Sequence, residues 1–292
     1  AKLRDQALVK GDKKARIALM EYALVYRDQR LLNELHRAGL QAASHPEKAW
    51  PTLEKKHYLL YSLKNPGGVL READKYGVDF RNCFGQTPLM IGSRMGNADL
   101  IAQLLERDAD LSLVDGNGLN AFQIALDRAC ADERFARVRL PAVFERLAPA
   151  SIDIQVDGRL VKLDRRLMEY LMLCVALVLF YQRLGENWAA RRHLLTAVDF
   201  AAVLEHFPES VVPERRKKRA YVSSILSKNE VSREGPYNRK LFLRVRHGQY
   251  LINPRLALRV EGEWRDIYDL LVPERLGSAL RDLDFWAGRD WD

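Results

Sequence analysis

At 292 residues the chain has room for about two domains, and its 48% hydrophobic and 29% charged residues are typical of a globular protein. The longest uncharged apolar run spans twelve residues, Tyr170 to Tyr181, which is well short of the roughly 20 that cross a membrane as a helix. No secretory signal is visible and the three cysteines form no CxxC pair, so we expect a cytoplasmic protein with no membrane contact, disulfide framework or zinc site.

Positive charge is concentrated in one segment. Residues 196–260 carry 13 Lys and Arg against 6 Asp and Glu, an excess of seven, whereas the whole chain has a net charge of +8. Concentrated positive charge is the electrostatic footprint of a surface that neutralises phosphates. The segment therefore predicts a nucleic-acid interface.

The first part of the chain, residues 1–64, predicts a helical cap. Apolar residues recur at helical spacing between Ile17 and Leu35, with a break near Asp28. Proline and glycine at Pro46 and in residues 65–68 then indicate turns.

An internal repeat follows in residues 65–150. The sequence Gly-Gln-Thr-Pro-Leu at Gly85–Leu89 is followed 33 residues later by Gly-Leu-Asn-Ala-Phe at Gly118–Phe122. Thr87 is placed to cap a first helix whose next residue is proline, and Gly96 allows the chain to reverse into a second helix. This unit resembles an ankyrin repeat.

The resemblance implies a solenoid of two to four stacked units. Such repeats bind protein partners on a concave surface and carry no built-in chemistry, so we expect a protein partner here. The chain departs from the family pattern at Met90, where a histidine is usual, and at Asn120–Phe122, where Thr-Pro-Leu is usual.

Residues 151–195 predict a junction. Two alternating stretches, Ile152–Val156 and Arg159–Leu163, flank Asp-Gly, the dipeptide favoured in two-residue hairpin turns. An apolar helix over Arg166–Arg183 follows.

Residues 196–260 predict three helices and a basic hairpin. Thr196 is placed to cap a helix over Ala197–Leu204, and Pro213–Val231 predicts a helical segment that opens on five consecutive cations. Strands are expected at Leu241–Val245 and Tyr250–Asn253. This order resembles winged helix-turn-helix domains, in which one helix enters the DNA major groove and the wing contacts the backbone or minor groove.

By that resemblance a set of polar and basic side chains would contact duplex DNA. The helical part supplies Arg215, Arg216, Lys217, Lys218, Arg219, Tyr221, Ser223, Ser224, Lys228 and Asn229, and the loop and hairpin supply Arg233, Arg239, Lys240, Arg244, Arg246 and His247. Arg and Lys suit phosphates and guanine edges, and Asn229 suits adenine.

Residues 261–292 predict an acidic tail. Residues 263–292 hold 8 acidic against 4 basic side chains, so the tail is a candidate mask for the basic segment. The histidines lack HxxxH or HExxH spacing and no phosphate-binding glycine loop is present, so we expect neither metal, cofactor nor enzymatic activity.

The sequence thus predicts a mainly α protein, with an ankyrin-type solenoid, a β-hairpin junction and a C-terminal winged helix. The predicted function is that of a DNA-binding adaptor or regulator of bacterial type, in a transcription, mobile-element or phage-defence assembly. The alternative is a structural subunit that does not bind DNA and uses both parts to contact proteins. The sequence leaves the DNA target and the oligomeric state open.

Overall fold

The computed structural model of the chain describes residues 5–12, 14–16, 19, 66–81, 86–115, 118–184, 194–260 and 262–271. About 52% of these residues are helical and 17% lie in strands, so the fold class is α+β. Most of the predicted cap and the predicted tail from residue 272 onward lie outside the described residues, which begin with a short π-helix, η1 (Asp5–Val9).

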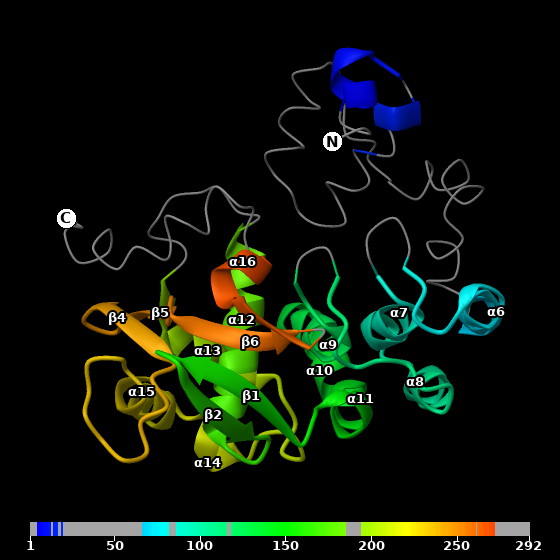
Figure 1. Cartoon of the computed structure of the whole chain (residues 1–292). Coiled ribbons are helices and arrows are strands. Elements are labelled where there is room, and N and C mark those ends of the chain that lie inside the picture. The colour runs from blue at the N-terminus through cyan, green and yellow to red at the C-terminus, as the bar shows by residue number, and fades with distance from the viewer. Residues whose placement is uncertain are drawn as a thin grey trace.

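Six helices lie side by side on one flank of the molecule (Figure 1). We call this part the helical stack, residues 66–148. Its helices are α6 (Pro66–Tyr76), α7 (Pro88–Met95), α8 (Ala98–Leu105), α9 (Ala121–Ala131), α10 (Glu133–Val138) and α11 (Leu140–Leu147).

Local sequence signals set the ends of these helices. Thr87 and Asn120 each open a helix with a capping box, in which the side chains of the cap and of the third helical residue bond each other's backbone N–H. Gly96 ends α7 at φ 65°, and a Cβ there would lie 2.6 Å from the ring of Phe135. Only glycine satisfies both the left-handed backbone and the close approach of α10.

Side-chain contacts in the stack follow the 33-residue spacing of the sequence. Arg107 Nε lies 3.1 Å from Asp74 Oδ1, and Arg81 donates to the carbonyl of Val114, each across 33 residues. The Asp79 carboxylate accepts from the backbone N–H of Asp110 at 3.0 Å. Equivalent positions of successive segments therefore lie next to each other.

A four-stranded antiparallel sheet packs beside the stack. Its strands lie in the order β2-β1-β6-β7 and are β1 (Ser151–Val156), β2 (Arg159–Asp164), β6 (Leu256–Val260) and β7 (Glu263–Asp266). The predicted two-residue turn at Asp157 and Gly158 is confirmed, with φ of 49° and 77°. Ile154 pairs with Leu258, so the sheet joins segments about a hundred residues apart.

The rest of the chain forms a second, three-stranded sheet with helices packed on it. The sheet order is β3-β5-β4, with strands β3 (Leu195–Thr196), β4 (Phe242–Arg246) and β5 (Gln249–Ile252). The helices are α13 (Ala197–Glu205), α14 (Glu214–Lys217) and α15 (Arg219–Lys228). Helix α16 (Ile267–Leu271) follows β7 and contacts β6 and β7 of the first sheet.

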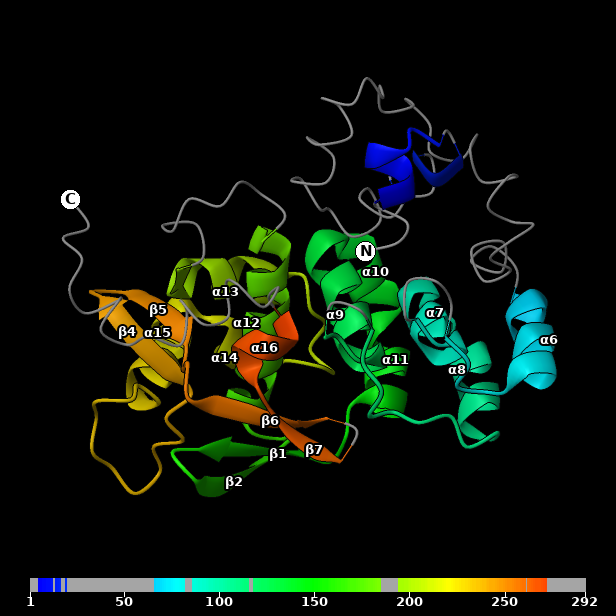
Figure 2. The same cartoon turned by 45° about the horizontal axis from the view of Figure 1, so that its top comes forward.

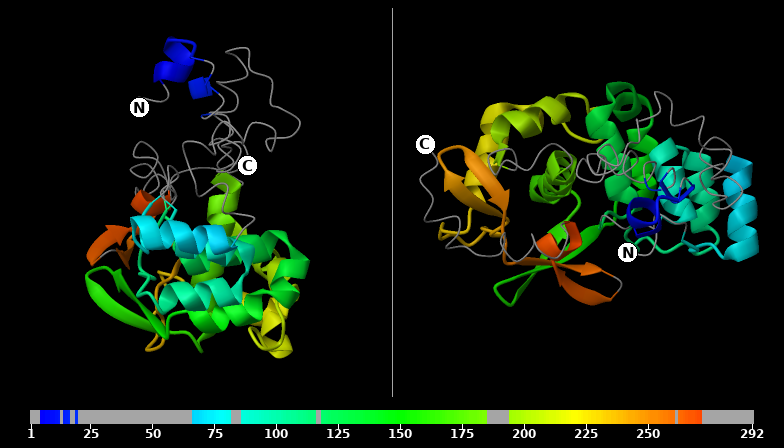
Figure 3. Two further views of the ribbon diagram at one scale, coloured as in Figure 1. Left: turned by 90° about the vertical axis from the view of Figure 1, so that its right-hand side faces the viewer. Right: turned by 90° about the horizontal axis from the view of Figure 1, so that it is seen from above.

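Helix α12 (Met168–Leu184) stands at the centre, between the stack and helices α13 to α15 (Figures 2 and 3). Every residue from Tyr170 to Phe180 is buried. Its carboxyl end is held on both sides, because Gln182 donates to the Asp127 carboxylate of α9 at 2.8 Å and Arg183 pairs with Asp199 of α13. Among the described residues, no helix is long and apolar enough to span a membrane.

The predicted fold class is therefore wrong. The expectation of a mainly α ankyrin solenoid with a separate winged-helix domain fails because two antiparallel sheets are present, and one hydrophobic core runs from Val69 through α12 to Leu271. Periodicity located helices and hairpins one at a time. It gave no sign that β1 pairs with β6, because register between distant strands depends on tertiary packing.

Candidate nucleic-acid interface

The basic run Arg215–Arg219 is divided between two helices. The sequence predicted one helical segment over Pro213–Val231, but Lys218 is extended, at φ −59° and ψ 131°, and separates the single turn of α14 from α15. The break places the cations at the end of one helix and the start of another, so they do not share one helix face.

Two of the five cations are engaged within the protein. Arg216 Nη1 donates to the Arg166 carbonyl at 3.0 Å, and the Lys217 ammonium pairs with Glu214 while its side chain is only 10% exposed. The other three are exposed and form no hydrogen bond or ion pair through their side chains among the described residues; they are Arg215, Lys218 and Arg219.

Helix α15 buries its apolar side and presents polar residues outward. Its buried residues, Val222, Ile225 and Leu226, join the core. Ser223 and Lys228 are exposed on the other side. Tyr221 and Ser224 are half-buried.

Asn229 does not take part in this surface. It is only 1% exposed, its Nδ2 donates to the Ile225 carbonyl at 3.0 Å, and its Oδ1 accepts from the backbone N–H of Arg239 at 3.0 Å. The predicted contact with adenine is corrected on this ground, because both ends of the amide are already bonded within the protein.

Two further buried asparagines hold the loop of residues 230–241, which we call the basic loop. Asn238 Nδ2 donates to the carbonyls of Glu230 and Arg233, at 2.8 and 2.7 Å, and its Oδ1 accepts from the Lys240 N–H at 2.7 Å. Asn253 then donates to the Lys240 carbonyl at 2.7 Å. Lys240, at φ 52°, is held in a left-handed conformation by these bonds.

The basic loop carries cations at fixed positions. Arg233 is exposed, and Arg239 and Lys240 are half-exposed. Tyr237 lies between them in the sequence and is 82% exposed. The sequence analysis missed this tyrosine, although the Gly-Pro turn that precedes it in a basic context is a usable signal.

The hairpin of β4 and β5 adds a third basic element. Arg244 and His247 are exposed, whereas Arg246 is half-buried and contacts other parts of the protein. The strand register shifts between Arg244 and Arg246, a bulge that turns their side chains relative to a regular strand.

These three elements form what we call the basic face, within residues 213–247. The segment holds 11 Lys and Arg against 3 Glu. One of those carboxylates, Glu214, pairs with Lys217, and a second, Glu230, is buried and accepts from Ser232 at 3.1 and 2.9 Å. The third, Glu234, is exposed, so the exposed cations of the segment still outnumber its exposed carboxylates that have no cation partner.

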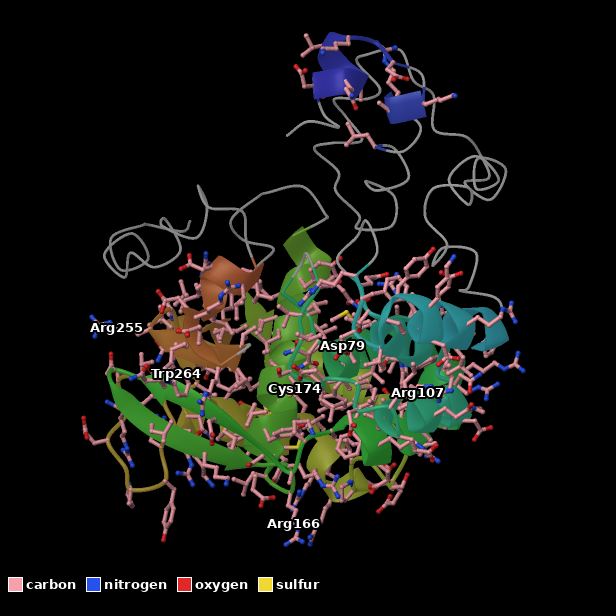
Figure 4. The ribbon with its side chains drawn as sticks, turned by 45° about the vertical axis from the view of Figure 1, so that its right-hand side comes forward. Asp79, Arg107, Arg166, Cys174, Arg255 and Trp264 are labelled. Atoms are coloured by element: carbon pink, nitrogen blue, oxygen red, sulfur yellow. The ribbon has the colours of Figure 1, made fainter. Side chains whose placement is uncertain are left out.

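Arg166 is a second residue that the sequence analysis missed. It precedes α12, is exposed, and projects from the edge of the molecule (Figure 4). Its carbonyl is bonded by Arg216, so it lies beside α14. Only tertiary contact brings it to the basic face, 50 residues away in sequence.

Comparisons with protein-family models, with curated proteins and with solved structures find no match to the chain. Function is therefore inferred from the chemistry of the chain's own residues.

The described residues offer little for other chemistry. They contain no group of three or more His, Cys, Asp or Glu placed to hold a metal ion. Burial raises the pKa of the Cys174 thiol to about 12, and burial with the nearby Asp127 raises the pKa of the Cys130 thiol. Both thiols stay protonated near neutral pH, which makes them poor nucleophiles.

Proposed function

We propose that this chain binds duplex DNA through the basic face. The observation that carries the proposal is a set of exposed cations without carboxylate partners among the described residues, namely Arg215, Lys218, Arg219, Lys228, Arg233 and Arg244. Unpaired exposed cations bind phosphates without first breaking an internal ion pair.

Three structural elements support the set. The cations come from the α14–α15 break, the basic loop and the hairpin, and each element is anchored to the core by buried residues. An anchored backbone needs little further ordering on binding, which favours affinity. Contacts to phosphate fix position and carry no sequence information, so the expected binding is largely independent of sequence.

The test is fluorescence anisotropy of a random-sequence DNA duplex with the full chain across a salt series. Six phosphate contacts predict a log–log slope of about −5, at roughly 0.9 per contact. Replacing Arg215, Lys218 and Arg219 with alanine removes three of these contacts. We expect the slope to fall by about 3 and the affinity near 0.1 M salt to fall roughly a hundredfold.

The stack offers a matched control with the same loss of charge. Arg107, Arg128 and Arg137 are also surface arginines, but each is paired with a carboxylate. Alanine at these three positions is expected to change DNA affinity less than threefold. Equal losses in the two variants, or binding that does not depend on salt, would reject the basic face as the DNA site and leave the protein-binding subunit as the better interpretation.

A protein partner for the helical stack stays a prediction. Affinity capture with residue-specific crosslinking from the stack checks it independently of the DNA measurement.

A further inference from the structure

A cavity of about 380 Å³ lies between the helical stack and the four-stranded sheet, away from the basic face. The loop before α9 borders it, as do α9, α12, β1 and β6. Figure 4 looks toward this part of the molecule, where Cys174 of α12 is labelled at the centre. Its volume is within the range of small-molecule sites, roughly 300–1,000 Å³.

The walls are mostly apolar and include two aromatic rings. The rings of Phe122 and Tyr170 stack at 6.3 Å between centroids, and Leu147, Leu177 and Leu258 add aliphatic surface. Such a wall favours a flat apolar molecule.

Two amide groups in the wall are left as hydrogen-bond donors. In the capping box of α9, Asn120 Oδ1 accepts from the Gln123 N–H and Gln123 Oε1 accepts from the Asn120 N–H, both at 2.9 Å. A backbone N–H can only donate, so it fixes which side-chain atom is the oxygen. Each side chain therefore keeps an NH₂ group, and both residues line the cavity.

The third donor is the Tyr170 hydroxyl. Tyr170 is 0% exposed, and its hydroxyl has no hydrogen-bond partner in normal geometry, although the weakly accepting thiol of Cys174 and the Arg165 guanidinium lie near it. Burial raises the pKa of this hydroxyl, so it stays protonated and able to donate. Buried hydroxyls in native proteins are nearly always bonded, which makes this one a candidate for a bound acceptor.

The remaining polar lining does not favour a charged ligand. Asp153 and Arg259 both line the cavity and supply one charge of each sign. The donors that line the cavity near the rings are neutral. The nearby Arg165 does not line the cavity and is paired with Glu145 at 3.7 Å. An ion that leaves water needs charged partners to offset the loss of hydration.

We propose that this cavity binds a small, neutral aromatic molecule that carries a carbonyl or similar hydrogen-bond acceptor. Its rings lie against Phe122 and Tyr170, and its acceptor takes hydrogen bonds from the Tyr170 hydroxyl and the amides of Asn120 and Gln123. The site is independent of the DNA-binding proposal.

The test uses two probes of nearly equal size, coumarin, a neutral two-ring lactone, and naphthalene, which has no acceptor. Binding of each to the full chain is measured by ligand-observed NMR titration. Both are expected to bind with millimolar or tighter Kd. In Tyr170→Phe, coumarin binding weakens about fivefold, the value of one neutral hydrogen bond, while naphthalene binding changes less than twofold.

A second variant fills the cavity. Leu258→Trp is expected to abolish binding of both probes while thermal unfolding shows that the chain still folds. If either variant fails to fold, amide chemical-shift mapping of the wild-type chain replaces it, with shifts expected at the cavity residues. The proposal is overturned if neither probe binds, if Tyr170→Phe affects both probes equally, if Leu258→Trp still binds, or if the shifts lie elsewhere.

Discussion

Several arginines of the helical stack are paired with carboxylates, whereas most exposed arginines of the basic face are not. The stack holds 10 Lys and Arg against 12 Asp and Glu, and its ion pairs join Arg107 to Asp74, Arg128 to Asp132 and Arg137 to Glu133. In the basic face, 11 cations meet 3 carboxylates, and Lys217 with Glu214 is the ion pair found among its described residues. Cations are denser in the basic face, and the two regions also differ in the number and spacing of their carboxylates.

That spacing is local in the stack. Two of its pairs join residues four apart on one helix, the separation at which side chains meet. Helix α15 has no carboxylate at such a position for Arg219 or Lys228. The cations of the basic face are thus available to an external anion, which is what a phosphate-binding surface requires.

The two regions nevertheless share one core, and the largest predicted effect tests this. Phe180 of α12 is fully buried and its ring meets the edge of Tyr268 at 5.2 Å. Phe180→Ala is expected to cost about 3–5 kcal/mol from lost burial and the cavity left behind. Urea denaturation followed by amide hydrogen exchange should show both regions losing protection in one transition.

The exposed Tyr237→Ala is the control, with an expected change within about 0.5 kcal/mol. Loss of protection in only one region after Phe180→Ala would mean that the stack and the basic face unfold as separate units.

A smaller effect is expected at the anchor of the basic loop. Asn238→Ala removes three hydrogen bonds and takes the side-chain partner from the Arg233 carbonyl and the Lys240 N–H, while the Glu230 carbonyl keeps its bond from the Arg233 N–H at 3.2 Å. The expected cost is about 2–3 kcal/mol, and amide exchange should accelerate in residues 230–241. Unchanged exchange there would show that the loop is held by other contacts. The stack should keep its exchange rates.

An ion pair like those of the stack can be introduced into the basic face by placing a carboxylate four residues from an arginine. Ser223 is exposed and lies four residues after Arg219, so Ser223→Glu gives this arginine the partner that it lacks. We expect DNA affinity to fall about tenfold, or ~1.4 kcal/mol, by charge neutralisation, with little change in stability. Ser223→Gln keeps the size without the charge and should bind DNA nearly as the wild type does.

The opposite change removes an ion pair from the stack. Glu133→Gln frees Arg137 in the stack, and DNA affinity should change less than twofold. A clear gain in affinity would show that any surface arginine without a carboxylate partner binds DNA. The basic face would then no longer be singled out as the DNA-binding site.

Local signals in the sequence were enough for many single elements. The caps at Thr87 and Thr196 and the Asp157–Gly158 turn lie where residue chemistry predicted them, because each depends on neighbours within a few residues. The break at Lys218 was missed, since no glycine or proline marks it.

In the candidate site, too, some features could be predicted from the sequence and others depend on tertiary contacts. The exposure of Arg215 and Arg244 follows from polar residues at the surface, whereas the burial of Asn229 depends on a bond to Arg239, ten residues ahead. Arg166 reaches the basic face only through its contact with Arg216. Composition predicted that this surface carries positive charge. Tertiary contacts decide which of its side chains are left without a partner inside the protein.

The smallest predicted effect concerns pH and again separates the two regions. Asp132 caps α10, and the hydrogen bond from the Phe135 N–H, followed by that from Arg128, holds the pKa of this carboxyl below its usual range. A lowered folded-state pKa means that the ionised form stabilises the fold above the unfolded pKa, about 3.9, and that this contribution is lost as pH falls through the folded pKa. The stability advantage of wild type over Asp132→Asn should therefore be constant from pH 7 to about pH 5 and shrink below pH 4 in urea denaturation.

Arg215→Gln in the basic face should leave the same pH profile unchanged, because Arg215 has no carboxylate partner among the described residues. A profile altered by Arg215→Gln would mean that this arginine is paired in solution, and the unpaired state on which its phosphate-binding role depends would then be wrong.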